Sequence, residues 1–120
     1  MKDLSTSTSR KRVLSGIQPT GEVHLGNYLG ALRQWVHMQD EYECFYVIVD
    51  QHAILGDGDP ADLPTRTIDT AISLLSVGLD PEKCTIFVQS DVPEHLELQW
   101  LFNTVAPVGD LERMTQYKDK

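Results

Sequence analysis

Residues 13–32 read VLSGIQPTGEVHLGNYLGAL, and this stretch decides the fold. It begins as a short apolar run, passes through a turn rich in Gly, Pro and Thr, and continues as an amphipathic helix predicted to start near Val23 or His24. Apolar side chains recur on that helix at helical spacing, with aromatic residues beside them: Leu25, Leu29, Leu32 and Val36, flanked by Tyr28 and Trp35. A strand, a loop and a helix inside about 25 residues predict the opening of a βαβ unit.

The junction between this strand and this helix favours an anionic ligand. The first backbone N–H groups of a helix have no partner inside the helix, and the helix dipole places partial positive charge there. Glycines that let a phosphate approach the backbone, and side chains with hydrogen-bond donors, gather at the same end: Gly16, Gly21, Gly26, Gln18, Thr20, His24 and Asn27. Three glycines alone indicate only a turn geometry, but the sequence HLGN at the helix mouth favours phosphate contact.

Two further segments predict buried strands, and helices follow each of them. Residues 44–49 and 85–89 are short, almost continuously apolar runs, as expected of parallel strands covered on both faces. Helices are predicted over residues 63–77, with Gly78 as their stop, and over 94–106. A last helix is predicted over 111–120, with Asp110 as its cap. The side chains predicted to face inward are Ile68, Ala71, Ile72 and Leu75, and then Leu96, Trp100 and Leu101.

The predicted fold class is α/β, because strands joined by helical crossovers form a parallel sheet. Three strands are few for such a sheet, and the last helical pattern stops at Lys120 without a turn or a closing strand. We therefore expect the first half of a Rossmann-like nucleotide-binding fold, truncated at its C-terminus, over residues 13–120. The Ser- and Thr-rich residues 1–12 are expected to form a disordered leader.

Polar residues follow the two later strands at the point where each is predicted to end. Residues 50–53 read DQHA, and residues 89–91 read QSD. Ligands of open α/β sheets bind at the carboxyl ends of the strands, so His52 is a candidate site residue.

Composition narrows the class of protein. Ten Lys and Arg stand against eighteen Asp and Glu, for a net charge of −8, which argues against a broad nucleic-acid-binding face on this chain. The sequence holds no apolar run of transmembrane length and no secretory signal. Cys44 and Cys84 have no partner at metal-ligand spacing and are expected to be buried thiols in a reducing compartment, which predicts a cytoplasmic protein.

Residues 16–32, 50–53 and 109–118 resemble, in this order, three motifs of the tryptophanyl-tRNA synthetases, class I synthetases of the tyrosyl/tryptophanyl group. The resemblance runs from about Val13 to Lys120, nearly the whole chain. His24-Leu25-Gly26-Asn27 stands where the class I His-Ile-Gly-His signature stands, with Asn in place of the second His.

The resemblance implies an activity and a set of site residues. The family activates tryptophan with ATP and Mg²⁺ to the adenylate and transfers it to tRNA(Trp). No residue is expected to ligate a metal directly. By the resemblance, His24, Asn27 and Lys120 would be catalytic. The nucleotide would be bound by Gln18, Pro19, Thr20, Gly26, Asn27 and Lys118. The amino-acid pocket would include Leu14, Gly16, His52 and Gln116.

The chain also departs from the family pattern. The second signature, Lys-Met-Ser-Lys-Ser, is absent, and so are the segment whose Asp would accept the indole N–H and the tRNA-binding domain. We therefore interpret the sequence as an N-terminal part with weak or no ligase activity alone. By the resemblance, the complete protein would be a homodimer.

Two alternatives stay open. A small cytidylyl- or adenylyltransferase shares a His-x-Gly-His loop but carries a second His at the position of Asn27. A flavodoxin-like module would bind a phosphate ligand at the same edge without catalysis.

Overall fold

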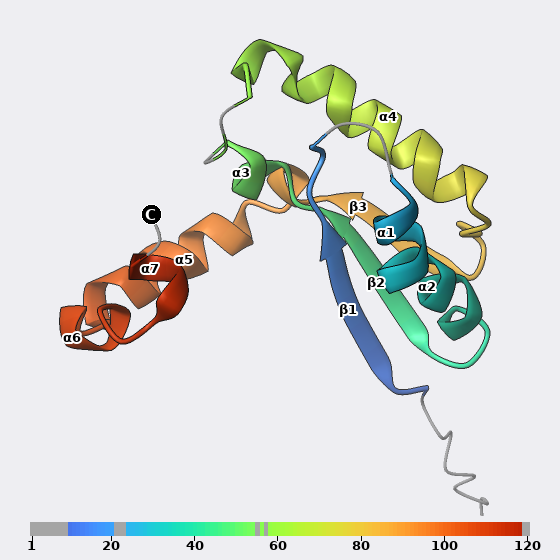
Figure 1. The fold of residues 1–120 in the computed structure, drawn as a ribbon. Helices are drawn as coiled ribbons and strands as arrows, with labels where there is room; N and C mark the ends of the chain where they lie inside the picture. The colour runs from blue at the N-terminus through green and yellow to red at the C-terminus, as the bar shows by residue number, and fades with distance from the viewer. Residues whose placement is uncertain (1–9, 21–23, 55, 57, 119–120) are drawn as a thin grey trace, which may run out of the picture.

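The computed structural model describes residues 10–20, 24–54, 56 and 58–118, and it contains one parallel sheet with helices (Figure 1). The three strands are β1 (Arg12–Ile17), β2 (Glu43–Ile48) and β3 (Cys84–Val88). The helices are α1 (Leu25–Asn27), the π-helical η1 (Tyr28–Leu32), α2 (Arg33–Met38), α3 (Asp50–Ala53), the 3₁₀ helix η2 (Pro60–Asp62), α4 (Leu63–Ser76), the 3₁₀ helix η3 (Gln89–Asp91), α5 (Glu94–Val105), α6 (Val108–Leu111) and α7 (Thr115–Lys118).

The sheet has the order β1-β2-β3 and is parallel throughout, which confirms the predicted α/β class. Ser15 pairs with Tyr46, and Tyr46 pairs with Ile86. β1 begins at Arg12, inside the segment predicted as a leader, and an ion pair of 2.8 Å joins Arg12 to Glu43 on β2. Residues 1–9 of the predicted leader lie outside the described residues.

One face of the sheet carries the hydrophobic core. Alternate residues of β2 face the helices, and α2 and α4 cover this side of the sheet (Figure 1). The ring of Tyr46 stacks on that of Trp35 with centroids 4.5 Å apart, and its hydroxyl donates to the carbonyl of Trp35 at 2.9 Å. Such an aromatic pair is worth about 0.5–1.5 kcal/mol beyond its buried area. The core consists of Leu32, Trp35, Cys44, Tyr46, Ile48, Leu74, Leu79 and Cys84.

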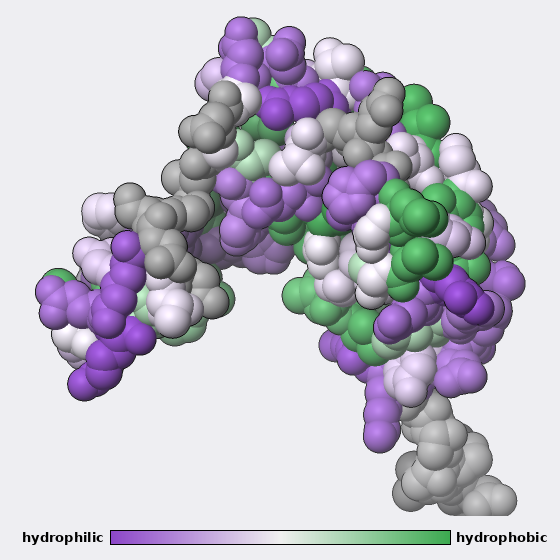
Figure 2. Space-filling model, viewed as in Figure 1, coloured by the Kyte–Doolittle hydropathy of each residue, from purple (hydrophilic) through white to green (hydrophobic). Residues whose placement is uncertain are grey.

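The predicted apolar stripe of the first helix is only partly correct. Leu32 and Trp35 are buried, but Leu25 is 70% exposed and Leu29 is 51% exposed. Figure 2 shows apolar side chains gathered on the surface over this part of the chain. The prediction assumed 3.6 residues per turn throughout, whereas η1 has the wider π-helical turn and rotates one end of the helix relative to the other.

The predicted helix over 63–77 is confirmed as α4, and of its predicted inward side chains only Ala71 packs against the core. Ile68, Ile72 and Leu75 are exposed, while Thr70 and Leu74 face the core. The helix carries two apolar stripes, and the inner one includes a threonine. Burial of Thr70 is tolerated because its hydroxyl donates to the carbonyl of Arg66 at 2.8 Å. The predicted stop is correct: Gly78 follows with a φ of +107°.

The helical arm, residues 94–118, extends away from the sheet (Figure 1). The predicted helix over 94–106 is confirmed as α5, but none of its residues is buried, so the inward placement of Leu96, Trp100 and Leu101 is wrong. The radius of gyration is 17.7 Å, against about 14 Å for a compact chain of this length. Apolar spacing indicates that a helix face is hydrophobic, not that the same chain covers it.

The single helix predicted over 111–120 is also wrong. α6 ends at Leu111 and α7 begins at Thr115, because the N–H groups of Arg113 and Met114 bond three residues back and tighten the last turn. Asp110 lies inside α6 and pairs with Arg113 instead of capping a helix. No described helix is long and apolar enough to cross a membrane.

Both cysteines are buried, as predicted, and the strand register makes them neighbours. Burial, with the Cys44 thiol beside it, raises the pKa of the Cys84 thiol. The folded state therefore holds this proton more tightly than the unfolded chain does. As the pH rises and the unfolded chain loses the proton first, the free energy of unfolding falls. We expect the free energy of unfolding, measured with urea, to fall above about pH 8.5. Cys84→Ala should flatten this fall, and an unchanged slope would contradict the assignment.

Candidate functional site

The mouth of the first helix is closed by a reciprocal pair of hydrogen bonds between His24 and Asn27. His24 Nδ1 accepts from the backbone N–H groups of Gly26, at 3.1 Å, and Asn27, at 3.3 Å. Asn27 Oδ1 accepts from the backbone N–H of His24 at 3.2 Å. This is a capping box in which His and Asn replace the usual Ser and Glu.

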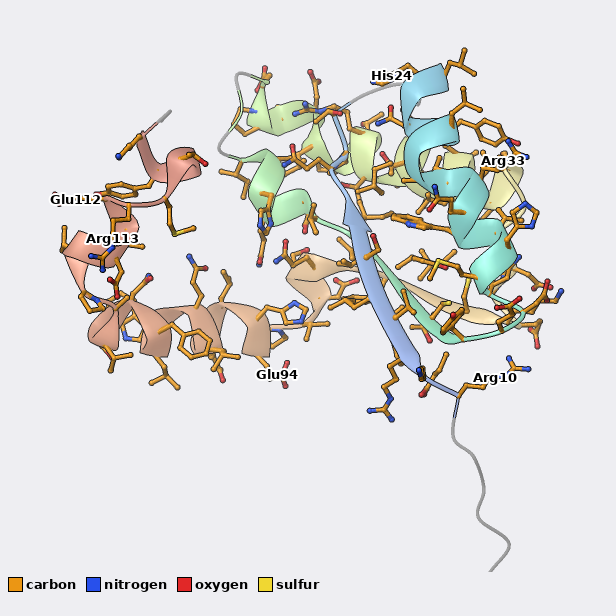
Figure 3. The ribbon with its side chains drawn as sticks, turned by 60° about the horizontal axis from the view of Figure 1, so that its bottom comes forward. Arg10, His24, Arg33, Glu94, Glu112 and Arg113 are labelled. Atoms are coloured by element: carbon orange, nitrogen blue, oxygen red, sulfur yellow. The ribbon has the colours of Figure 1, made fainter. Side chains whose placement is uncertain are left out.

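The cap has two chemical consequences. Since Nδ1 accepts hydrogen bonds, the proton of the neutral His24 imidazole lies on Nε2, which is left as a donor. The first N–H groups of the helix, expected to lack partners, are instead bound: those of Gly26 and Asn27 donate to the imidazole, and that of Asn27 also donates to the carbonyl of His24 at 3.0 Å. Gly26 allows this approach, because a Cβ there would lie 3.0 Å from the ring. Figure 3 shows His24 at the outer end of the helix, far from the labelled residues of the helical arm.

The turn after β1 carries the other predicted nucleotide contacts. Gln18 and Thr20 are exposed, and the N–H of Thr20 donates to the carbonyl of Gln18 at 2.9 Å. Pro19 between them is fully buried and offers no surface to a ligand in this structure. Gly21 lies outside the described residues.

The carboxyl ends of β2 and β3 are joined by side chains. Asp50, which is 9% exposed, accepts the backbone N–H of Ser90 at 3.1 Å through its Oδ1. His52 Nδ1 lies 3.1 Å from Oε1 of Gln89. His52 therefore lies at the edge of the sheet where it was predicted.

Two predicted pocket residues lie on β1. Leu14 is 67% exposed, and Gly16 lies two residues along on the same face, opposite the core. A Cβ at Gly16 would approach the side chains of Val47 and Val49 to 3.0 Å, so these neighbours would have to move to admit a side chain. Leu14 and Gly16 thus line the sheet face that the described helices leave uncovered.

A groove of about 450 Å³ also lies beside His24, between α1 and η1 on one side and α4 on the other. Its two serine hydroxyls are already used: Ser73 donates to the carbonyl of Asp69 at 2.8 Å and Ser76 to that of Ile72 at 2.7 Å. The groove contains no Lys or Arg and suits an apolar ligand better than a triphosphate. The described residues contain no group of three or more His, Cys, Asp or Glu placed to hold a metal ion.

Residues 6–120 match the family model described as tRNA synthetases class I (W and Y). The chain belongs to this family of class I tRNA synthetases.

Curated relatives and solved structures agree with this assignment. Tryptophan--tRNA ligase 2 of Streptomyces avermitilis is 57% identical over 115 residues, which are 95% of this chain and 34% of that protein. Tryptophan--tRNA ligase of Corynebacterium glutamicum is 54% identical over 120 residues, 99% of this chain and 34% of that protein. This class I synthetase chain therefore spans about a third of the length of these relatives.

Among solved structures, the tryptophanyl-tRNA synthetase of Campylobacter jejuni complexed with ADP and tryptophan matches with a TM-score of 0.84. It is 42% identical, and the match covers 90% of this chain and 34% of that one. The tyrosyl-tRNA synthetase of Archaeoglobus fulgidus matches with a TM-score of 0.75 at 18% identity, covers 89% of this chain and 35% of that one, and supports the fold alone.

The remaining predicted site residues of this class I synthetase chain lie on or beyond α7. Gln116 and Lys118 belong to α7, on the helical arm, and Lys120 lies outside the described residues. Sequence reasoning did not assign Asp50 and Gln89 a role in the site. Both occur in the polar segments that follow the strands. Their contacts, Asp50 with Ser90 over 40 positions and Gln89 with His52 over 37, follow from the pairing of β2 with β3.

Proposed function

We propose that this chain forms the N-terminal part, over residues 13–120, of the catalytic domain of a tryptophan–tRNA ligase. Its reaction would join tryptophan to ATP as tryptophanyl-adenylate and then transfer the tryptophan to the 3′ end of tRNA(Trp). The observation that carries the proposal is the HLGN cap at the carboxyl edge of a parallel sheet. The similarity to proteins named tryptophan--tRNA ligase, at 54–57% identity, supports the choice of amino acid.

The chemistry needs positioned donors and no side-chain nucleophile. The tryptophan carboxylate attacks the α-phosphorus of ATP, and pyrophosphate leaves. Mg²⁺ bound to the nucleotide would supply charge neutralisation on the phosphates. His24 offers its Nε2–H, and Asn27 offers its Nδ2 amide, because Oδ1 is held by the cap. These donors would stabilise the negative charge of the transferring phosphoryl group. Gln18, Thr20 and Gly26 would contact the nucleotide, with Pro19 supporting their turn.

The other parts of the site complete the proposal. Lys118 and Lys120 would face the phosphates, and Lys120 is the proposed catalytic lysine. The amino-acid pocket would be formed by Leu14, Gly16, His52 and Gln116.

Partners and location follow from the same proposal. The protein would be cytoplasmic, and tRNA would be bound by segments outside this sequence. A homodimer is supported by the exposed apolar side chains of α5, with Trp100 70% and Phe102 59% exposed.

A chimera tests the function. Residues 1–120 replace the matching segment of the Corynebacterium glutamicum enzyme, and ATP–pyrophosphate exchange is measured with each amino acid. We expect exchange with tryptophan only, and none from the 120-residue chain alone. Turnover of CTP or pantetheine phosphate would favour the nucleotidyltransferase alternative. Phosphate-ligand binding without turnover, in a chimera that folds, would favour the flavodoxin-like alternative.

Asn27→Ala in this chimera should raise the KM for ATP by on the order of tenfold or more and leave the KM for tryptophan within twofold, because one donor to phosphate is lost. Asn27→Asp keeps the oxygen acceptor of the cap and removes the donor, so it should show the same split. Equal losses for both substrates would contradict the role of Asn27 in ATP binding.

A further inference from the structure

Asp50 joins the ends of two neighbouring strands through a single oxygen atom. It is the first residue of α3 and only 9% exposed. Its Oδ1 accepts the N–H of Gln51, at 3.0 Å, and the N–H of Ser90 in η3, at 3.1 Å. The carboxylate therefore fixes the start of α3 against η3.

A second contact crosses the same junction. His52, two residues after Asp50, places Nδ1 3.1 Å from Oε1 of Gln89, the residue before Ser90. When Nδ1 carries the proton, it donates to Gln89, and Nε2 is left as an acceptor. α3 has only four residues and no helical stability of its own, so the position of the imidazole depends on what holds α3.

The carboxylate of Asp50 holds the two segments together through the position of its oxygen and not through an ion pair. Each of the three ion pairs among the described residues joins other side chains, and none includes Asp50. Both bonds to Oδ1 come from backbone N–H groups. The side-chain oxygen of an asparagine in the same position could accept the same two bonds.

We propose that Asp50 is a positioning residue, which holds α3 against η3 and thereby orients the His52 imidazole toward the amino-acid substrate. This role rests on the proposed function, in which His52 borders the amino-acid pocket. In this role Asp50 acts through His52 and not on the substrate itself.

Two substitutions separate position from charge. Asp50→Asn keeps an oxygen at Oδ1 and removes the charge, whereas Asp50→Glu keeps the charge and moves the oxygens by one methylene. In the chimera we expect Asp50→Glu to raise the KM for tryptophan by about tenfold to a hundredfold, with the KM for ATP unchanged. Asp50→Asn should stay within about threefold of the parent. Asp91→Asn, an exposed carboxylate on the same 3₁₀ helix, is the matched control and should change neither constant.

The role through His52 is tested by a double-mutant cycle. In a His52→Ala background, Asp50→Glu should cause no further rise in the KM for tryptophan, because the group it positions is gone. If Asp50→Asn is as damaging as Asp50→Glu, if both KM values rise together, or if the two substitutions are additive, the proposal is overturned. Where Asp50→Glu does not fold, Asp50→Ala takes its place.

A measurement on the 120-residue chain needs no activity. Hydrogen exchange of the Ser90 amide should be slow in the parent and in Asp50→Asn, and fast in Asp50→Glu, with the ¹⁵N shifts of the His52 ring changing in Asp50→Glu alone. A Ser90 amide that exchanges equally in all three overturns the positioning role. A chimera without tryptophan-dependent exchange would overturn the proposed function instead, and the amide and ring signals would still decide whether Asp50 orients His52.

Discussion

Replacing Gln39 with alanine is expected to lower the free energy of unfolding by roughly 1–3 kcal/mol, because two backbone groups lose the side chain that joins them. Gln39 is 4% exposed at the end of α2. Its Nε2 donates to the carbonyl of Gly78 at 3.0 Å, and its Oε1 accepts the N–H of Asp80 at 2.9 Å. One side chain thus joins the first crossover helix to the turn between α4 and β3. Urea denaturation of the 120-residue chain measures the loss.

Volume and hydrogen bonding are separated by a second variant. Gln39→Met has nearly the same length but makes neither bond, so we expect it to be almost as destabilising as Gln39→Ala. Gln34→Ala, on the exposed side of the same helix, is the control and should stay within about 0.5 kcal/mol of the parent. A Gln39→Met chain as stable as the parent would show that the two bonds contribute nothing.

The parts of the fold that the sequence predicted are those that local physics determines. The apolar runs of β2 and β3 were found because strands of parallel sheets are typically continuously hydrophobic. The described helices cover only one face of this sheet, so the expected cover on both faces is not met within the described residues. The end of α4 was found because Gly78 adopts a positive φ that other residues avoid. Both signals lie within a few residues of the structure they specify.

The errors arise where a helix has two apolar faces, or where a contact joins residues that are distant in the sequence. α4 has an outer stripe that is more hydrophobic than its inner one, and Thr70 is buried only because a helix carbonyl accepts its hydroxyl proton. The apolar side chains of α5 face solvent, because the helix leaves the sheet. No local pattern encodes the contact of Asp50 with Ser90, which depends on the pairing of β2 with β3.

In the candidate site, too, the sequence predicted the position of the residues but not the contacts that they make. HLGN was correctly placed at a helix mouth, but residue types alone indicated free N–H groups there. The structure shows that His24 binds two of these groups, so the residue expected to be purely catalytic is also a helix cap. The side chain of His24 therefore has a structural and a chemical role at once, and a substitution must separate them.

His24→Ala in the chimera is expected to slow tryptophan-dependent pyrophosphate exchange by on the order of a hundredfold, because a donor to the transferring phosphoryl group is lost. It should also cost about 1 kcal/mol of stability, since the cap is lost. The first effect is measured as kcat for exchange and the second by urea denaturation of the 120-residue chain.

His24→Asn separates the two roles, because asparagine is a good cap but has no group in the position of Nε2. We expect it to restore the stability lost in His24→Ala and to leave exchange as slow as in that variant. Recovery of both would make His24 a cap alone. If exchange stays slow, the imidazole ring itself connects the two roles. The N–H groups of Gly26 and Asn27 donate to Nδ1, and this keeps the ring proton on Nε2, where the phosphate would need a donor.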